Sequence, residues 1–350
     1  MNKLFSRGSD ALAMAAIDSG LKFYAGYPIT PQNDIPEFLS RELPKAGGIF
    51  VQAESEIASI NMLLGASSCG FRVMTSSSSP GISLMQEGIS YLAGSELPAV
   101  IVNVTRWGPG LGGIGASQGD YHQATKGGGH GDYFTPVFAP YSVQEMYDLT
   151  IKAFETADKY RTPTLVLADV MISLMKETLV RRYPEGVSLP EKSWAFREKK
   201  EGKQKIIKSL YLKGNDLEVH NWKLYKKFEE MKKNEVMYES YQCDDADIII
   251  VAFGMVARVV RSTVELAREN GVKLGLFRPI SLVPYPEEEL FSHTKTCKNF
   301  FVVEMNTGQM LYDVMRILGK DVNIKFYGKP SSYVPTPDEL FQKTKELFKI

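Results

Sequence analysis

Cysteine is scarce in this 350-residue sequence, and its three cysteines, Cys69, Cys243 and Cys297, lie far apart. No CxxC pair occurs, so the chain lacks the usual ligand spacing of an iron–sulfur cluster or a zinc knuckle. A sparse, odd number of cysteines is typical of proteins in a reducing compartment. We therefore expect a cytoplasmic protein whose fold is not held by disulfide bonds.

An excess of charge of one sign is also lacking, because 41 Lys and Arg balance 41 Asp and Glu. Nucleic-acid binding through phosphate contacts needs a basic surplus, so we expect no nucleic-acid partner. Long hydrophobic runs are missing too, and nowhere do about 18 apolar residues follow one another, as a membrane-spanning helix requires. Residues 1–20 lack the pattern of a signal peptide. We expect no membrane association.

What the sequence does contain is an alternation of strands and helices over residues 1–178. Such alternation with short connections predicts an α/β domain with a parallel sheet covered on both faces. The expected strands are 22–25, 48–53, 72–75, 97–105 and 163–168, and the expected helices are 9–19 with Ser9 as N-cap, 56–68, 82–93 and 143–160. Three irregular segments, 26–31, 76–81 and 106–135, each follow a strand. Because ligands bind at the carboxyl ends of parallel strands, we expect these segments to gather at one edge.

The composition changes near residue 178. Residues 191–235 hold thirteen Lys and Arg against eight Asp and Glu, and we interpret 179–240 as a basic connector that carries one exposed helix. Its charges are either a solvated face or a docking surface for a partner subunit, and their mixed sign disfavours nucleic acid. A second, smaller α/β domain is expected over 241–350, with strands 248–253, 272–277, 300–304 and 322–326 and helices 257–269, 286–292, 307–318 and 337–348.

Standard catalytic motifs are absent: the sequence has no GxSxG, no Walker A motif and no HExxH. The run 108–115 has the glycines of a dinucleotide fingerprint, but Pro109 breaks the turn and no amphipathic helix follows. A glycine-rich loop whose backbone approaches a ligand is the better interpretation. His122 and His130 lie in this loop. They bind either a metal, with Asp120 or Asp132, or the backbone and a substrate.

Glu56 is the sharpest single candidate, since it lies where strand 48–53 turns into helix 56–68. A carboxylate there is either a cap or first-turn acid stabilised by the helix dipole, or a group that points into the strand-end cleft and bonds a heterocycle nitrogen. Glu54 competes for either role. Arg106 ends the buried strand 97–105 and is either a surface arginine or a bidentate ligand for a carboxylate or phosphate.

Two hydroxyl-bearing segments at the same strand ends are the remaining candidates. Thr30 stands between Ile29 and Pro31 and is either a turn hydroxyl or part of a site. The serines of 76–79 either cap helix 82–93 or line a site.

Three segments of the chain resemble a known family. They are GYPITPQNDIPEFLSRELP, then VQAESEIASINMLLGASSCGFRVMTSSSSPGISLMQEGISYLAGSELPAVIVNVTRWGPGLGGIGASQGDYHQATKGGGHGDY, and LFRPISLVPYPEEEL. Together they resemble the alpha subunit of the 2-oxoacid:ferredoxin oxidoreductases, most closely the 2-oxoisovalerate (3-methyl-2-oxobutanoate) branch, with the 2-oxoglutarate branch as near neighbour. The resemblance spans essentially the whole chain. It implies a pyrimidine-binding domain of the thiamine-diphosphate fold followed by a transketolase C-terminal-like domain.

The resemblance implies a thiamine diphosphate shared between this chain and a beta subunit, which supplies the diphosphate and Mg²⁺ site. It also implies a gamma subunit and a ferredoxin-like delta subunit, with the iron–sulfur clusters on partner chains and no metal on this one. The implied reaction is oxidative decarboxylation of a 2-oxoacid to acyl-CoA and carbon dioxide, with electrons passed to ferredoxin.

The site residues follow from the same resemblance. Glu56 falls on the family's glutamate that bonds the aminopyrimidine ring and favours its imino form, which takes the proton from the thiazolium carbon. Thr30 falls on a threonine near cofactor and substrate, and Arg106 on an arginine that pairs with the 2-oxoacid carboxylate. The remaining expected contacts are Tyr27, Pro28, Ile29 and Ser78 for the cofactor and Ser117, Gln118, Tyr121 and His122 for the substrate.

Two other functions stay open at this point. One is a non-catalytic structural subunit of such a complex. The other is a transketolase-type transferase without electron transfer, although the chain has no diphosphate motif (GDG followed by Asn) that would make it self-sufficient.

Overall fold

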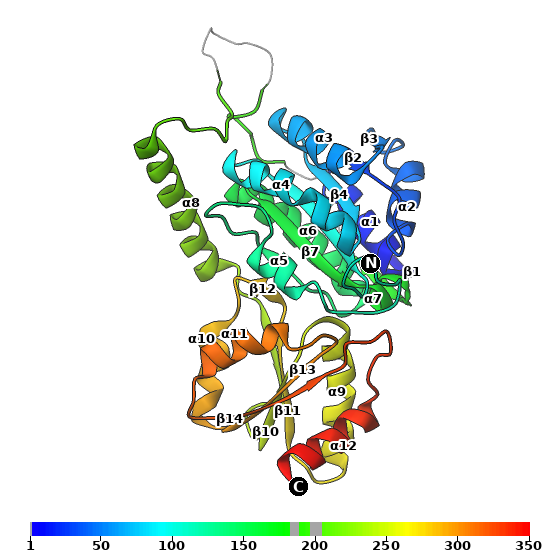
Figure 1. Ribbon diagram of the computed structural model, residues 1–350. Coiled ribbons are helices and arrows are strands. Elements are labelled where there is room, and N and C mark those ends of the chain that lie inside the picture. The colour runs from blue at the N-terminus through cyan, green and yellow to red at the C-terminus, as the bar shows by residue number, and fades with distance from the viewer. Residues whose placement is uncertain (1, 183–188, 197–204) are drawn as a thin grey trace.

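The computed structural model describes residues 2–182, 189–196 and 205–350 of the chain. Parts of the predicted connector, residues 183–188 and 197–204, lie outside this range. Two α/β units are stacked one above the other, and a long helix runs along one flank of the larger unit (Figure 1). In the described part of the chain, none of the helices combines the length and the apolar character that a bilayer crossing requires.

Seven strands form the first sheet, in the order β12-β6-β7-β5-β4-β2-β3. The pairs from β3 to β6 are parallel, whereas β12 runs antiparallel to β6. The strand bounds are β2 (Phe23–Gly26), β3 (Ile49–Gln52), β4 (Val73–Ser77), β5 (Ala99–Thr105), β6 (Val137–Phe138), β7 (Pro163–Asp169) and β12 (Ser281–Val283). Every residue of the central strands β4, β5 and β7 is buried, as expected for a parallel sheet with both faces covered.

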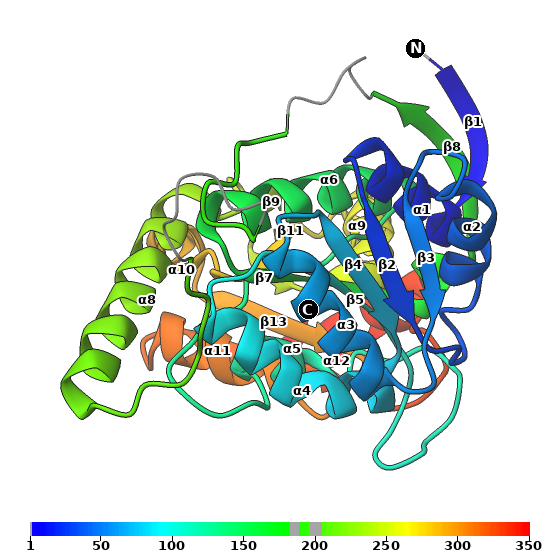
Figure 2. The ribbon, with the colours of Figure 1, turned by 90° about the horizontal axis from the view of Figure 1, so that it is seen from above.

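Helices cover both faces of this sheet. Figure 2 shows α3 and α4 together on one side and α1 and α6 on the other. Their bounds, with that of α2, are α1 (Gly8–Asp18), α2 (Asp34–Glu42), α3 (Glu56–Ser68), α4 (Ser79–Gly94) and α6 (Val143–Tyr160). Neighbouring residues of β5 face opposite ways: Val102 packs in the same core as Leu12 of α1, and Ile101 in the same core as Ile60 of α3.

The chain start differs from the prediction. Residues Asn2–Arg7 form strand β1, which pairs antiparallel with β8 (Lys176–Arg181). This pairing keeps the backbone extended through Arg7, so Arg7 is the N-cap of α1 and the predicted cap, Ser9, is wrong. Ser9 lies instead in the first helical turn, buried against the fold. The backbone N–H of Gly8 donates to the carbonyl of Met175, 3.1 Å away. This hydrogen bond fixes the backbone at the point where α1 begins.

The second unit is built on a five-stranded sheet in the order β14-β13-β10-β11-β9. Its strands are β9 (Tyr238–Tyr241), β10 (Ile248–Val251), β11 (Leu274–Pro279), β13 (Asn299–Glu304) and β14 (Asn323–Gly328), and its helices are α9 (Gly254–Glu269), α10 (Glu287–Ser292), α11 (Gln309–Leu318) and α12 (Pro337–Phe348). All four predicted strands and all four predicted helices are present. Strand β9 was not predicted, and it adds antiparallel to β11.

The two units are joined by more than the connector. Strand β12, which follows β11 in the sequence, leaves the second sheet and pairs with β6 at the edge of the first. Arg278 at the end of β11 is buried and donates two 2.8 Å hydrogen bonds to Glu145 of α6 and one of 2.9 Å to Glu239 of β9. The predicted exposed helix of the connector is α8 (Gly214–Asn234).

Candidate functional site

The carboxyl ends of β2, β4 and β5 meet at one edge of the first sheet, as the sequence predicts. Arg106, directly after β5, donates from Nη1 to the carbonyl of Thr30, 2.9 Å away in the turn after β2. The Arg106 backbone N–H donates to Oγ of Ser79, the first residue of α4, at 3.0 Å. The three irregular segments are therefore joined by direct hydrogen bonds, although they are far apart in the sequence.

Glu56 is the first residue of α3 and is buried at this edge. It is not the helix cap, because Ser55 is the N-cap and its Oγ accepts the N–H of Ala58 at 3.1 Å. The carboxylate lies against Gly81 of α4: a methyl group on Gly81 would come within 2.5 Å of Glu56 Oε1 and 2.0 Å of Ser77 Oγ. The missing side chain of Gly81 therefore lets Glu56 and Ser77 pack directly against α4. Glu54, the competing candidate, is exposed.

The serines at the end of β4 and directly after it have two different roles. Ser76 is held in a buried network, in which its Oγ lies 2.7 Å from the Tyr24 hydroxyl and donates to Gln32 Oε1 at 2.6 Å. The Oγ atoms of Ser77 and Ser78 are buried and have no hydrogen-bond partner within the described protein. Ser78 is the N-cap of α4 but makes no side-chain cap bond. Buried hydroxyls are normally satisfied, so this pair is available to a bound polar group.

The turn after β2 is largely open to solvent. Tyr27, Pro28 and Thr30 are exposed, and Ile29 is half-buried. Gln32 stabilises this turn, because its Nε2 donates to the carbonyl of Tyr27 at 3.2 Å. The structure thus brings the Tyr27–Thr30 turn to the same edge as Arg106.

Arg106 is buried, with 8 % of its surface exposed. Its Nη2 donates to the carbonyl of Leu111 at 3.3 Å, in addition to the Thr30 contact, while its Nε has no hydrogen-bond partner among the described residues. In this state the guanidinium ties the β2 turn to the glycine-rich loop, and its Nε–H is available to an incoming acceptor.

Asp120 is a residue whose role the sequence did not reveal, since it was considered only as a metal ligand. Its Oδ2 accepts hydrogen bonds from Ser79 Oγ at 2.5 Å and from Asn103 Nδ2 at 2.9 Å. Burial raises the pKa of Asp120 above its ordinary value, and the two hydrogen bonds and the Arg106 charge oppose that rise. Asn103 is the one amide in strand β5, whose other residues are apolar except for Thr105 at its end. A polar residue in a buried strand is the sequence signal from which this hydrogen bond to Asp120 could have been predicted.

The four predicted substrate residues lie where the loop meets the second unit. Gln118 donates from Nε2 to the carbonyl of Phe253 at 2.8 Å, and the Tyr121 hydroxyl donates to Asp313 at 2.7 Å. His122 Nε2 lies 3.0 Å from the carbonyl of Gln309. These three side chains are therefore engaged with the second unit.

Ser117 differs from its three neighbours because it lines a cavity of about 380 Å³ between the loop and the second unit. Trp107, Pro109, Asp120 and Thr307 are among the other residues that line this cavity. No Lys or Arg belongs to its described lining.

The metal site of His122 and His130 with Asp120 or Asp132, one of the two predicted alternatives, stays a prediction. Among residues 2–182, 189–196 and 205–350, no three His, Cys, Asp or Glu side chains gather in a way that would hold a metal ion. His122 is bonded to the carbonyl of Gln309, as in the alternative reading of a backbone contact.

Comparison with known sequences shows that each of the two units matches a described sequence family. Residues 14–241 match the sequence family described as pyruvate flavodoxin/ferredoxin oxidoreductase, thiamine diP-bdg, and residues 246–340 match pyruvate:ferredoxin oxidoreductase core domain II. The ketoisovalerate oxidoreductase subunit VorB of Methanothermobacter thermautotrophicus is 50% identical over 91% of either chain. The 2-oxoglutarate synthase subunit KorA of Methanocaldococcus jannaschii is 37% identical, over 96% of this chain and 97% of its own.

Solved structures agree with this assignment. The chain matches a 2-oxoglutarate:ferredoxin oxidoreductase from Magnetococcus marinus with a TM-score of 0.88 and 27% identity, over 98% of this chain and 65% of that one. A split-gene transketolase, with a TM-score of 0.59 and 11% identity, shares the fold alone. The expected thiamine-diphosphate-binding fold with a transketolase-like relative is confirmed. Sequence, fold and site edge together show that the chain belongs to the family of 2-oxoacid:ferredoxin oxidoreductases.

Proposed function

We propose that this chain is the thiamine-diphosphate-binding subunit of a complex that oxidises 2-oxoisovalerate and other branched-chain 2-oxoacids. The products are the acyl-CoA and carbon dioxide, and the electrons pass to ferredoxin. The observation that carries the proposal is Glu56, a buried carboxylate that is not the cap of its helix and that packs against Gly81 beside the Ser77 hydroxyl. It lies at the carboxyl edge of a parallel sheet, where such folds bind cofactors.

The side chains at this edge fit the aminopyrimidine half of thiamine diphosphate. That ring has nitrogen donors and acceptors, and the unpartnered hydroxyls of Ser77 and Ser78 and the Glu56 carboxylate are groups that hydrogen-bond to such atoms. When bound, thiamine diphosphate supplies the nucleophilic carbon and the electron sink for loss of carbon dioxide. Glu56 holds a proton at a ring nitrogen and so selects the imino form of the ring. Tyr27, Pro28, Ile29 and Thr30 form the adjoining wall.

Arg106 and Thr30 are proposed to bind the 2-oxoacid. An arginine donates two parallel hydrogen bonds to a carboxylate, and such charge-assisted pairs are strong in a site that excludes water. The Arg106 Nε–H is buried and has no partner in the part of the chain that the structure describes, which supports this role. The weak 3.3 Å contact to Leu111 is the bond that an incoming carboxylate would replace.

The choice of substrate rests on two observations. The VorB relatives are 50% and 49% identical, whereas the KorA relatives reach 38%. The described lining of the cavity beside Ser117 combines Asp120 with apolar side chains and neutral polar ones, and it contains no Lys or Arg. A second carboxylate, as in 2-oxoglutarate, would be desolvated there without a counter-charge. Both observations favour a monocarboxylic, branched substrate.

Partner chains complete the site in this proposal. A beta subunit supplies the diphosphate and Mg²⁺ site, and gamma and ferredoxin-like delta subunits carry the remaining functions, including the iron–sulfur clusters. The relatives are named as subunits, so the family forms multi-subunit complexes. Leu111 and Ile114 are 82% and 63% exposed beside the candidate site, which favours a covering chain at this edge.

The test is a co-expressed complex of this chain with its partner subunits. It should reduce viologen or ferredoxin with 2-oxoisovalerate in a reaction that requires coenzyme A and thiamine diphosphate. Glu56→Gln should lower turnover about a hundredfold or more and abolish the circular-dichroism band of the imino cofactor, while the cofactor still binds.

Glu54→Gln is the matched control, because Glu54 is exposed and stands two positions earlier. Its turnover should stay within twofold of the parent. A loss of less than tenfold in Glu56→Gln would refute the assigned role and favour a structural subunit. A higher kcat/KM for 2-oxoglutarate than for 2-oxoisovalerate would refute the substrate.

A further inference from the structure

Asp120 closes a ring of hydrogen bonds between separate parts of the first unit. Its Oδ2 accepts the Ser79 hydroxyl at 2.5 Å and the Asn103 Nδ2 group at 2.9 Å. The ring is completed by the backbone N–H of Ser79, which donates to Asn103 Oδ1 at 3.0 Å. Because Ser79 begins α4 and Asn103 lies within β5, the ring ties the glycine-rich loop to a helix start and to a central strand.

Ser79 passes this restraint on to Arg106. Its Oγ accepts the backbone N–H of Arg106 at 3.0 Å and lies 3.1 Å from the Arg106 carbonyl oxygen. A hydroxyl group has a single hydrogen to donate. While Asp120 accepts that hydrogen, the lone pairs of the Ser79 oxygen are directed at the Arg106 N–H. Without Asp120 the hydrogen turns to the Arg106 carbonyl instead, and the hydroxyl loses its fixed orientation.

The second unit fixes the backbone on both sides of Asp120. Gln309, the first residue of α11, donates from Nε2 to the carbonyl of Gly119 at 2.7 Å. Its Oε1 accepts the backbone N–H of His122, also at 2.7 Å. The Gln118 side chain is bonded to the second unit as well. The backbone that carries Asp120 is therefore held by the second unit, while its carboxylate bonds to the first.

We propose that Asp120 is a positioning residue for Arg106. It acts through Ser79, which holds the Arg106 backbone so that the guanidinium can reach the carboxylate of the 2-oxoacid. The second unit contributes by holding Asp120 through Gln309. This rests on the proposed function, in which Arg106 binds that carboxylate. A displacement of a binding group by about 1 Å is enough to cost a large part of its effect, so the supporting hydrogen bonds matter.

A direct action of the Asp120 charge on the substrate would have the opposite sign. Asp120 also lines the cavity of about 380 Å³ beside Ser117, and a carboxylate there repels an anionic substrate. Removing such a charge would lower the KM for a 2-oxoacid, whereas removing a positioning hydrogen bond raises it. Asparagine separates the two effects, because its amide oxygen still accepts from Ser79 and Asn103 although its charge is lost.

The test compares Asp120→Ala with Asp120→Asn in the co-expressed, purified complex, by steady-state kinetics on 2-oxoisovalerate. Asp120→Ala should raise the KM for 2-oxoisovalerate about tenfold or more. Its kcat should stay within about threefold of the parent, since lost binding of the ground state appears in KM. The KM for coenzyme A and the Kd for thiamine diphosphate should not change. Asp120→Asn should keep the parental KM or lower it.

A double-mutant cycle with Arg106→Gln tests whether Asp120 acts through Arg106. Arg106→Gln removes the group that Asp120 is proposed to position. Adding Asp120→Ala to it should then change kcat/KM by less than about twofold, because the effects of coupled residues do not add. An independent action of Asp120 would instead lower kcat/KM about tenfold in both backgrounds.

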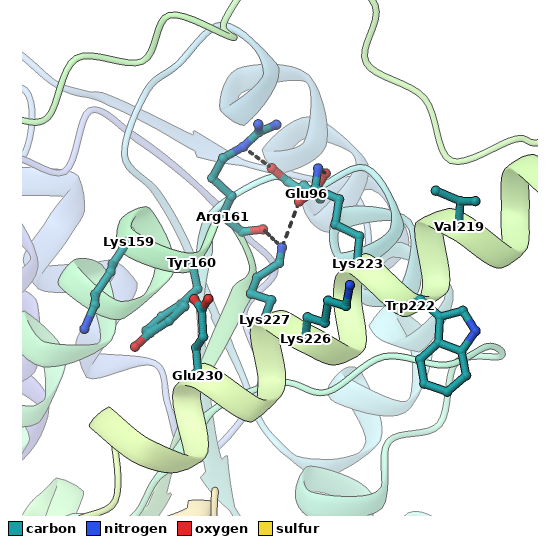
Figure 3. Close-up of a pocket in the computed structure, with 10 residues that line it drawn as sticks. All are labelled: Glu96, Lys159, Tyr160, Arg161, Val219, Trp222, Lys223, Lys226, Lys227 and Glu230. Atoms are coloured by element: carbon teal, nitrogen blue, oxygen red, sulfur yellow. Dashed lines mark hydrogen bonds and ion pairs between the residues drawn. The ribbon is translucent and has the colours of Figure 1, made fainter.

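Gln309→Ala is the second variant, because it leaves the ring of Asp120, Ser79 and Asn103 intact. It should raise the KM for 2-oxoisovalerate in the same sense, by about threefold. Glu230→Ala is the control. Glu230 is exposed on α8, in a groove of about 920 Å³ between α8 and the end of α6 that shares no lining residue with the candidate site (Figure 3). Its KM and kcat should stay within about twofold of the parent.

Hydrogen–deuterium exchange of the same complexes gives a readout that needs no activity. The peptide that contains the Arg106 N–H should exchange about fivefold faster or more in Asp120→Ala, and at the parental rate in Asp120→Asn. Unchanged exchange or an unchanged KM in Asp120→Ala would overturn the inference. So would an equal rise of KM in Asp120→Ala and Asp120→Asn, or a fall of kcat at constant KM.

Failure of the proposed function is a separate outcome. It would be seen in the parent complex, as absence of thiamine-dependent activity on 2-oxoisovalerate. In that case the exchange rates of Asp120→Ala and Asp120→Asn still decide whether Asp120 holds Arg106 in place.

Discussion

Asp169 is a buried carboxyl group at the junction of the two units, and its substitution tests the electrostatics of this junction. It ends β7, and its Oδ2 accepts the backbone N–H of Met255, in the first turn of α9, at 2.6 Å. Burial raises its pKa from 3.8 to about 7, while hydrogen bonds from Met255 and Gln118 oppose the rise. The folded state therefore holds a proton that the unfolded chain releases at lower pH.

The sign of the pH effect follows from this difference. Between pH 3.8 and about 7 the folded state binds more protons than the unfolded state, so stability falls as the pH rises. With those two pKa values, the favourable contribution of Asp169 is about 2.7 kcal/mol at pH 5 and close to zero at pH 8, by the linkage relation. Asp169→Asn is uncharged throughout and lacks this dependence.

The assay is denaturant unfolding of the parent and Asp169→Asn at intervals from pH 5 to pH 8. The stability of the variant relative to the parent should rise by about 2.5 kcal/mol across this range, most steeply below pH 7. Contributions of other carboxyl groups cancel in the difference. Asp132→Asn, at an exposed position, controls for loss of one charge. Parallel stability curves for parent and Asp169→Asn would refute the reasoning.

Two further predictions concern the site and the unit junction. Gly81→Ala should weaken thiamine diphosphate binding at least tenfold, because the new methyl group meets Ser77 Oγ at 2.0 Å and Glu56 Oε1 at 2.5 Å; isothermal titration measures it. Gly65→Ala, with no atom within 4 Å of its new methyl group, is the control and should bind normally. Arg278→Met should destabilise the fold by about 3–5 kcal/mol, because it removes the buried cation from Glu145 and leaves Glu239 only its ion pair with Arg261. Chemical denaturation checks this, and a loss under 1 kcal/mol would contradict it.

Local sequence patterns were enough to predict most of the elements and the meeting of the irregular segments. Glu56 is singled out as a candidate because a strand-to-helix junction is visible over a few residues. The gathering of the irregular segments, of which the Arg106–Thr30 hydrogen bond is an instance, follows from the general rule that parallel strands present their carboxyl ends at one edge. Neither inference required knowledge of long-range contacts.

What the sequence could not predict depends on pairing between distant segments. Strand β1 forms only because β8 lies beside it, about 170 residues later in the chain. The side chain of Gln118 is directed by Phe253 of the second unit, and nothing near position 118 indicates this. The same holds for Ser76, which looks like its neighbours in the serine run but is bonded to Tyr24 and Gln32.

Strand β12 has a consequence for how this protein is made and divided. It belongs in sequence to the second unit, yet it covers the outer edge of β6 in the first sheet. A chain shortened before residue 281 would expose that edge, and an unpaired sheet edge promotes aggregation. During synthesis, the edge of the first sheet therefore stays unpaired until the segment after β11 has been made. The first unit therefore completes its sheet only together with the second unit, although each unit has its own sheet.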